Sequence, residues 1–137
     1  MKNNSIILKN FKSHGLRNTK VRKTMLSLFN SYRKPMSADE LHQYIPNVNK
    51  TTIYRQLKTF EYQKVLKRID LKDGLMRYER NNMEHHHHII CNVCRKITDV
   101  KLKNDFMLEN QIIHRNNNYL ITEHILEFFG ICPDCRN

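Results

Sequence analysis

The sequence predicts an α+β fold of two small domains, a winged helix-turn-helix over residues 1–82 and a unit of short strands with one helix over residues 83–137. Three observations support this prediction. Apolar residues recur with helical spacing through the first sixty residues, an Asp-Gly hairpin signal follows them, and short strand-like runs make up the rest. A chain of 137 residues is long enough for one ordinary domain, or for two small ones that each need additional stabilisation.

The first two helices are expected before residue 32. Residues 5–13 predict a short helix that ends at Gly15. Thr19 can cap the next helix, because its hydroxyl accepts a hydrogen bond from the unpaired N–H groups of a first turn. Apolar residues then repeat with helical spacing, which predicts a helix over residues 20–31.

Two further helices are expected to form the helix-turn-helix. Ser37 followed by Glu40 matches a capping box, and the helix that starts there should stop before Pro46. The next helix should start near Asn49, with one apolar stripe and one polar face. The stripe contains Ile53, Leu57 and Phe60, and the polar face carries Thr52, Arg55, Gln56 and Lys58.

A hairpin is expected at residues 66–80. Polar and apolar residues alternate there on both sides of Asp73-Gly74, which is a strong short-range hairpin signal. Helix, turn, helix and then a two-stranded wing is the order of a winged helix-turn-helix. Residues 81–84 are interpreted as the hinge that ends this domain.

Beyond the hinge, strands are expected at residues 85–91, 96–102 and 119–132, with a helix at residues 104–115 between the last two. This second domain has few apolar residues from which to build an independent core. We therefore expect it to need a metal ion, a dimer partner or both.

Positive charge is concentrated in the first domain. Residues 1–82 hold 18 Lys/Arg against 6 Asp/Glu, a balance of +12, and residues 83–137 hold 6 against 7, a balance of −1, which together give the net +11. A basic half of this kind is typical of a domain that binds a polyanion. Plain solvation of a charged surface is the alternative interpretation.

Two Cys-x-x-Cys pairs, Cys91/Cys94 and Cys132/Cys135, are separated by 37 residues. Each pair can wrap one edge of a metal ion through a tight turn, so the four thiolates can hold a tetrahedral zinc ion. Such a site is closed and structural, and it would tie the last strand of the second domain to its first. A redox pair and four unrelated thiols are the alternatives, but no thioredoxin-like pattern surrounds the cysteines.

Four consecutive histidines precede the first cysteine pair. In a strand, successive side chains point to opposite faces, so His86 and His88 share one face and His85 and His87 share the other. Each pair needs further ligands, and mixed His/carboxylate sets suit Zn(II), Fe(II), Mn(II) and Ni(II) alike. A solvated histidine patch is the alternative. Candidate further ligands are Glu79 and Asp99 for one face and His124, Asp105 or Glu109 for the other.

Membrane proteins, secreted proteins and enzymes are disfavoured. No stretch approaches the 18 or so continuous apolar residues of a membrane span, and no signal peptide is recognisable, which predicts a cytoplasmic protein with no membrane partner. The chain has only three glycines, no phosphate-cradling loop and no Ser/His/Asp set. We therefore do not expect an enzyme, although a metalloenzyme with its ion on the histidines is a possible alternative.

Four motifs in combination resemble the ferric uptake regulator (Fur) family of bacterial metal-dependent repressors. They are "TTIYRQL" in the last helix of the helix-turn-helix, "RYE" before the hinge, "HHHHIICNVC", and "TEHILEFFGICPDC" at the end. The match covers nearly the whole chain. The resemblance implies an N-terminal winged helix, a C-terminal α/β dimerisation domain, and a homodimer that grips a palindromic operator in double-stranded DNA.

The resemblance also implies metal sites, which can be transferred position by position. The ligands of a structural zinc would be Cys91, Cys94, Cys132 and Cys135. A regulatory site for a second divalent ion, Fe(II) or Zn(II) with Mn(II) and Ni(II) as alternatives, would use Glu79, His86, His88 and Asp99. An additional site would use His85, His87 and His124, and its fourth ligand is expected near residue 106, so that Glu109 or Asp105 needs a shift of register.

DNA-contacting residues are implied in the same way. Tyr54 and Arg55 match residues of the recognition helix that meet DNA, and Arg17 falls where a basic residue enters the minor groove. Lys50 and Lys58 on the same helix are expected to neutralise phosphates of the DNA, because their side chains are cationic. Thr52, on the polar face of the same helix, is a further candidate for DNA binding.

The chain departs from the family pattern at one ligand. Many members have a histidine of the regulatory site where Lys34 and Pro35 stand here. Asp99 stands where peroxide sensors have Asp and iron sensors usually have Glu, yet those peroxide sensors also use the missing histidine. The sensed ion therefore stays open. A peroxide-sensing regulator and a metal-independent, zinc-stabilised DNA-binding adaptor are the alternatives to a metal-responsive repressor.

Overall fold

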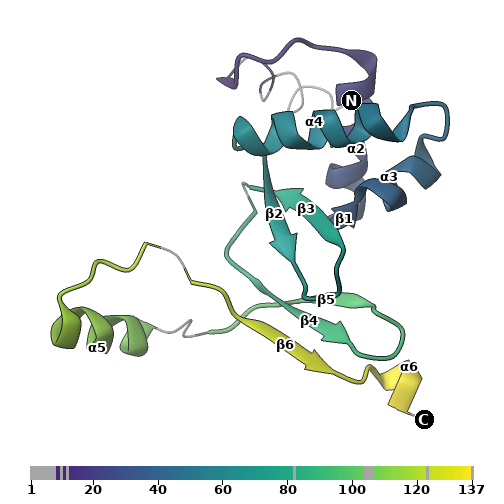
Figure 1. Ribbon diagram of the computed structural model, residues 1–137. Coiled ribbons are helices and arrows are strands. Elements are labelled where there is room, and N and C mark those ends of the chain that lie inside the picture. Colours follow the sequence, from purple (N-terminus) through teal and green to yellow (C-terminus); the bar gives the residue numbers. More distant parts are fainter. Residues whose placement is uncertain are drawn as a thin grey trace. The chain divides into compact units, whose positions relative to one another are not determined.

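The computed structural model describes residues 9, 11, 13–81, 83–103, 107–122 and 124–136, without the side chains of residues 107–110. These residues belong to two compact units, Met1–Met83 and Glu84–Asn137, whose helices and strands are labelled in Figure 1. Most of the helix expected over residues 5–13 lies outside the described residues.

Three helices of the first unit begin at the caps that the sequence predicts. Thr19 Oγ1 accepts a hydrogen bond of 3.3 Å from a first-turn N–H group, and Asn49 Oδ1 accepts one of 2.8 Å. Ser37 and Glu40 form the expected capping box, in which each side chain accepts from the other's backbone N–H. The helices are α2 (Lys20–Tyr32), α3 (Ala38–Tyr44) and α4 (Lys50–Tyr62).

The wing is a three-stranded antiparallel sheet in the order β1-β3-β2. Gly74 has a φ of 78°, a left-handed conformation that suits glycine in the turn between the two long strands. Strand β1, which has only two residues, was not predicted, because its pairing with β3 is long-range and leaves no local pattern. The strands are β1 (Met36–Ser37), β2 (Leu66–Asp70) and β3 (Met76–Arg80).

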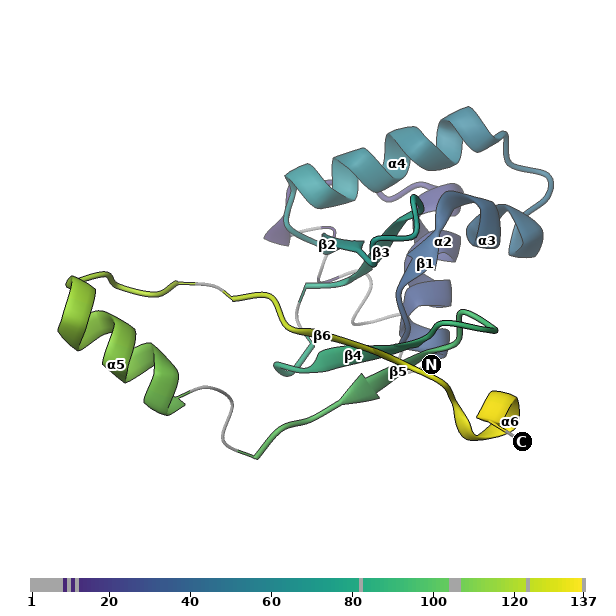
Figure 2. The ribbon, with the colours of Figure 1, turned by 60° about the horizontal axis from the view of Figure 1, so that its bottom comes forward.

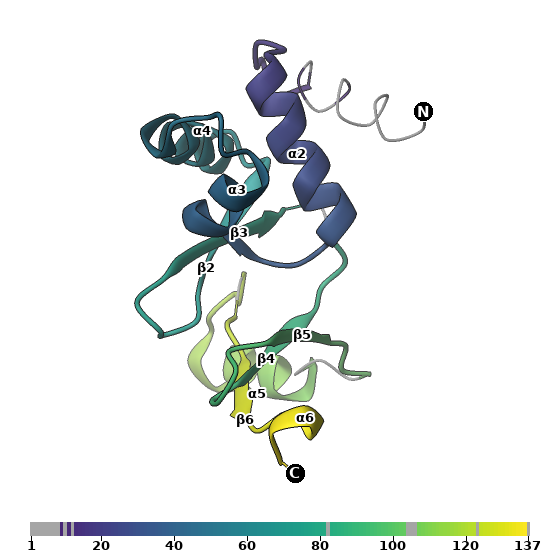
Figure 3. The same cartoon turned by 90° about the vertical axis from the view of Figure 1, so that its right-hand side faces the viewer.

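A single apolar core joins the helices and sheet of the first unit. Figure 3 shows α2, α3 and α4 gathered on one side of β2 and β3. Apolar side chains of all three helices are buried in this core. The predicted stripe of α4 is completely buried. The largest buried side chains of this core include Met25, Leu26, Phe29, Met36, Leu41, Ile53, Leu57, Phe60 and Leu66.

The second unit contains a three-stranded sheet in the order β5-β4-β6, in which β4 pairs antiparallel with β5 and parallel with β6. Figure 2 shows β6 running beside β4. Its elements are β4 (His87–Cys91), β5 (Ile97–Val100), α5 (Met107–Asn117), β6 (Glu127–Gly130) and α6 (Pro133–Arg136).

Two elements of this unit differ from the sequence prediction. The last strand, expected over residues 119–132, is confined to Glu127–Gly130, because only these residues find backbone partners on β4. Strand-like composition before them has no neighbouring strand to pair with among the described residues. The short helix α6 was not predicted, since its four residues are too few to show a helical period.

Very little apolar surface is buried within the second unit. Among its described residues, Ile90 and Cys91 are the buried hydrophobic side chains, whereas Ile112 and Phe129 are about half exposed. The described side chains of α5 from residue 111 to residue 117 are all exposed. In the described part of the chain, no helix combines the length and apolar character that crossing a bilayer requires.

Candidate metal centres and nucleic-acid interface

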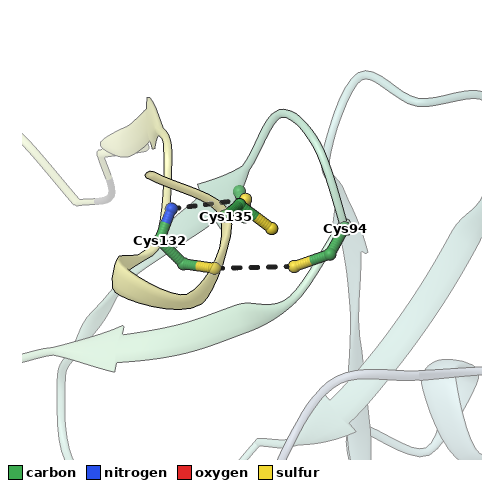
Figure 4. A group of neighbouring side chains, drawn as sticks. Cys94, Cys132 and Cys135 are labelled. Atoms are coloured by element: carbon green, nitrogen blue, oxygen red, sulfur yellow. Dashed lines mark hydrogen bonds between the residues drawn. The ribbon is translucent and has the colours of Figure 1, made fainter. Parts of the chain in front are cut away.

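Four cysteines converge at the end of the second unit. Cys91 ends β4, Cys94 lies in the turn after it, and Cys132 and Cys135 lie at α6. Their four sulfurs all lie within 4.8 Å of one another, and none of the cysteines forms a disulfide. Figure 4 shows the contact of 3.7 Å between the sulfurs of Cys94 and Cys132, with Cys135 close by.

Backbone N–H groups of tight turns also form hydrogen bonds around the four cysteines. The backbone N–H of Cys132 donates to Cys91 Sγ at 3.4 Å, and the backbone N–H of Cys135 donates to the Cys132 carbonyl at 3.0 Å. The N–H of Asn92 donates to the carbonyl of Gly130 at 2.7 Å, which joins the two cysteine turns directly. This backbone bond holds the two cysteine turns side by side, and the tie predicted through a zinc ion would be added to it.

The electrostatics of the four thiols favour a bound cation. N–H groups of Cys132 and Cys94 stabilise the thiolate and lower the pKa of Cys91 to about 6. Hydrogen bonds with Cys132 and Cys94 instead favour the protonated thiol of Cys135 and raise its pKa to about 12. A metal ion bound to all four sulfurs would displace the remaining protons and neutralise the thiolates. Tetrahedral zinc, with Zn–S bonds of about 2.3 Å, places its sulfurs about 3.8 Å apart, which fits the observed contact.

One histidine group lies on one side of β4. The ring centroids of His85 and His87 are 4.8 Å apart, and His124 lies 4.9 Å from the first and 5.3 Å from the second. One ligand atom from each lies within 4.8 Å of the others, so this set can hold an ion. The proposed fourth ligand, Glu109, has its side chain outside the described residues.

A second histidine pair lies on the opposite side of the strand. The ring centroids of His86 and His88 are 5.0 Å apart, and His88 Nε2 lies 3.8 Å from Asp99 Oδ1 on the neighbouring strand. The nitrogen Nδ1 of His86 lies 2.7 Å from the carbonyl oxygen of Glu84. A carbonyl oxygen only accepts, so Nδ1 carries the proton there and Nε2 is the nitrogen that can bind a metal.

Glu79, the remaining predicted ligand of the regulatory site, belongs to β3 in the first unit. Its side chain is only 1% exposed, and Lys67 Nζ on β2 lies 3.0 Å from its Oε1 atom. Sequence reasoning missed this lysine. The register of the hairpin, which pairs Lys67 with Glu79, was the available signal.

The polar face of α4 lies at the surface of the first unit. Tyr54 is 47% exposed, and Arg55 and Lys58 are exposed, while Thr52 is half-buried. The apolar side chains of the same helix are fully buried in the core, which fixes the direction of the polar face. This face can therefore present a cationic and aromatic surface to a nucleic acid.

Lys50, at the start of α4, is partly engaged within the protein. Its Nζ lies 2.7 Å from Asp39 Oδ1, and this hydrogen bond raises the pKa of Lys50. Both side chains are about half exposed, so the pair is weak and a phosphate can replace the carboxylate.

Arg22 is a polar link that sequence reasoning did not identify. Its Nε donates to Gln56 Oε1 on α4 at 2.7 Å, and its terminal nitrogen donates to the carbonyl of Arg17 at 3.1 Å. Two segments expected to meet DNA are thus joined through one guanidinium group. Arg22 and Gln56 are 34 residues apart in the sequence, so no local pattern predicts their contact.

Comparison with known proteins places these features in a family. The ferric uptake regulator family model matches residues 13–129. The ferric uptake regulation protein of Neisseria meningitidis is 31% identical over 130 residues, covering 91% of this chain and 90% of the relative. The peroxide-responsive repressor PerR of Staphylococcus aureus is 30% identical over 127 residues, covering 90% of this chain and 84% of the relative.

The fold agrees with that assignment. The solved structure of the Helicobacter pylori ferric uptake regulator, described as revealing three functional metal binding sites, is similar with a TM-score of 0.77 and 26% identity. The similarity covers 99% of this chain and 93% of that chain, which confirms the predicted α+β fold class. With a family model and relatives that match it over most of its length, this chain belongs to the ferric uptake regulator family of metal-sensing transcription regulators.

Proposed function

We propose that this protein is a metal-responsive repressor that acts in the cytoplasm as a homodimer, and that it is not an enzyme. A single observation carries the proposal. The four consecutive histidines form two separate pairs, His85 with His87 and His86 with His88, and both pairs are distinct from the cysteine cluster. The chain therefore has candidate ligands for ions besides the zinc proposed at the cysteines. A closed site of four thiolates holds its ion permanently, whereas a His/carboxylate site can exchange one.

The regulatory ion is proposed to bind Glu79, His86, His88 and Asp99. Glu79 precedes the proposed hinge at residues 81–84, and the other three ligands follow it. An ion held by all four ligands would favour one angle between a domain over residues 1–82 and a domain over residues 83–137. The loaded state would then place the two recognition helices of a dimer at one fixed spacing.

Residues of α4 are proposed to read the operator. Arg55 is exposed and suits a bidentate contact with guanine, which is worth about 1–3 kcal/mol against a wrong base. Tyr54 and Thr52 would contact bases or sugars beside it, and Lys50 and Lys58 would neutralise phosphates. Arg17 would reach the minor groove next to the site read by α4.

The group of His85, His87 and His124 is proposed as an additional site. Its three imidazoles suit Zn(II), Fe(II) or Ni(II), and a water molecule or Glu109 would complete the coordination. Because all three histidines belong to the second unit, an ion there would stabilise that unit without depending on the hinge.

A peroxide-sensing regulator is the second candidate function. It is favoured by the 30% identity to the Staphylococcus aureus repressor and by Asp99 as the carboxylate beside His88. Iron(II) reacts with hydrogen peroxide and Zn(II) does not. Loss of operator binding on peroxide treatment of the Fe(II)-loaded but not the Zn(II)-loaded protein would favour this candidate.

Binding to a DNA duplex selected from random sequences tests the main proposal. With the cysteine zinc retained, addition of a second divalent ion should strengthen operator binding at least tenfold, and Glu79→Ala or His88→Ala should abolish that gain. His114→Ala is a matched control, since this histidine lies on α5, outside the three ligand groups. Equal operator affinity of the metal-free and loaded proteins would refute the proposal.

A further inference from the structure

A lysine faces the buried carboxylate of the wing. The hairpin register pairs Lys67 of β2 with Glu79 of β3, and Lys67 Nζ lies 3.0 Å from Glu79 Oε1. The carboxylate is 1% exposed, whereas the lysine side chain is 43% exposed. The carboxylate of this ion pair is therefore fixed inside the protein, whereas the flexible side chain of Lys67 reaches the solvent.

The pair offsets an electrostatic cost within the hairpin. A buried carboxylate is costly unless a charge or hydrogen bonds compensate it, and Lys67 supplies a positive charge. The compensation can also be withdrawn easily. A lysine ammonium is a compact charge on a flexible stem, so it can swing into water when another cation takes the carboxylate.

Other ion pairs of the same hairpin lack this arrangement. Lys72 and Asp70 form a pair of 3.3 Å in which both side chains are mostly exposed, so solvent screens both charges. Arg77 and Asp73 form a pair of 2.8 Å in which both side chains are buried, so neither can leave easily. Among the ion pairs described in the hairpin, the lysine pair of Glu79 combines a buried anion with a cation that can depart.

We propose that Lys67 is a resident counter-ion of Glu79 that a divalent metal must displace, so that Lys67 sets the metal concentration at which the regulator responds. The inference rests on the proposed role of Glu79 as a ligand of the regulatory site. If Lys67 Nζ stayed 3.0 Å from Glu79 Oε1 while a divalent ion bound the same carboxylate, the ammonium group and the ion would repel each other strongly. Because Lys67 must be displaced, it reduces the affinity of the site for every divalent ion that the site accepts.

Titration of Mn(II) into the full-length protein with its cysteine zinc retained provides the test. Mn(II) is the weakest binder in the order of divalent metals, so it leaves thiolate-bound zinc in place. Lys67→Met should tighten Mn(II) binding roughly three- to tenfold, the range expected when one partly exposed charge pair no longer competes. Lys67→Arg keeps the charge and should change the affinity little. Lys72→Met is the matched control, because it removes the same charge from the same hairpin.

Thermal unfolding gives a second readout that does not depend on Mn(II) affinity. Without added metal, Lys67→Met leaves the buried Glu79 carboxylate without this counter-charge and should lower the unfolding midpoint. With Mn(II) in excess, the ion replaces the ammonium group, and the midpoint should return toward that of the unaltered protein. An unchanged or weaker Mn(II) affinity of Lys67→Met overturns the inference.

Glu79→Gln separates this inference from the proposed function. If Glu79 is a ligand, Glu79→Gln weakens Mn(II) binding, and adding Lys67→Met to it has no further effect. If Glu79→Gln weakens binding but Lys67→Met alone does not tighten it, the counter-ion role is wrong and the regulatory site stands. If Glu79→Gln leaves Mn(II) binding unchanged, both the site and the role of Lys67 are refuted.

Discussion

The two compact units of this protein are stabilised in different ways. The first packs three helices and a sheet around a continuous apolar core, in which Phe29, Leu57 and Phe60 are fully buried. The second has a small sheet and very few buried apolar side chains among its described residues, and it gathers cysteines and histidines instead. Burial of apolar surface thus holds the first unit, and convergence of metal ligands is available to hold the second.

This difference explains how a small regulator can respond to an ion. A unit with a full apolar core keeps its shape whatever the metal concentration, which suits the presentation of α4 to DNA. A unit with a deficient core depends on bound ions or on a partner for its order, so its state follows their concentration. We therefore expect the order of the second unit to depend on bound ions more than that of the first.

The largest effect is expected from removal of a cysteine ligand. Cys94→Ser should lose the structural zinc, which contributes on the order of 10 kcal/mol to folding in small zinc domains. Residues 84–137 should then become sensitive to proteolysis and lose the proposed dimer contacts, while the first unit keeps its protection. Elemental analysis, limited proteolysis and sedimentation would measure these outcomes. A stable, zinc-replete dimer of Cys94→Ser would contradict the comparison between the units.

Removal of a core side chain should have a smaller effect, and this effect should be confined to the stability of the first unit. Phe60→Ala deletes a fully buried ring of α4 and should lower the free energy of unfolding by about 3–5 kcal/mol, with the zinc content unchanged. Tyr62→Ala, two residues later and 85% exposed, is the matched control and should cost little. Loss of zinc from Phe60→Ala would show that the two units are not stabilised separately.

The smallest effect is expected at the polar link within the first unit. Arg22→Met removes the hydrogen bonds to Gln56 and to the Arg17 carbonyl, and it should weaken operator binding roughly three- to tenfold by loosening the segments that are proposed to contact DNA. Metal affinity should not change. Lys23→Met removes the same charge from the next position of α2, so an equal loss of DNA binding in both variants would attribute the effect to charge alone.

Local chemistry made much of the fold predictable. The caps at Thr19, Ser37 and Asn49 and the stripe of α4 each depend on residues close in sequence, and the structure places the helices accordingly. The turn at Gly74 follows from the same kind of short-range signal. Strand β1 and the true length of β6 were not predictable, because pairing with a distant strand decides whether an extended segment becomes a strand.

The candidate site shows the same division. Residue types and spacing identified the cysteine pairs and the alternation of the histidines, and the structure brings each set together within the second unit. The pairing of Lys67 with Glu79 and the contacts of Arg22 were missed. Both depend on side chains that meet only when strands or helices pack, and a charged residue in isolation gives no indication of its partner.

The amino-acid sequence by itself determined the family, the α+β class and which cysteines and histidines are candidate metal ligands, because these depend on residue type and short spacing. Tertiary structure alone decided which thiols lie in contact and which charge compensates the buried Glu79 carboxylate. The reason is physical. A thiolate's proton affinity and a carboxylate's counter-ion are set by groups a few ångströms away in space, and folding brings those groups from distant positions in the chain.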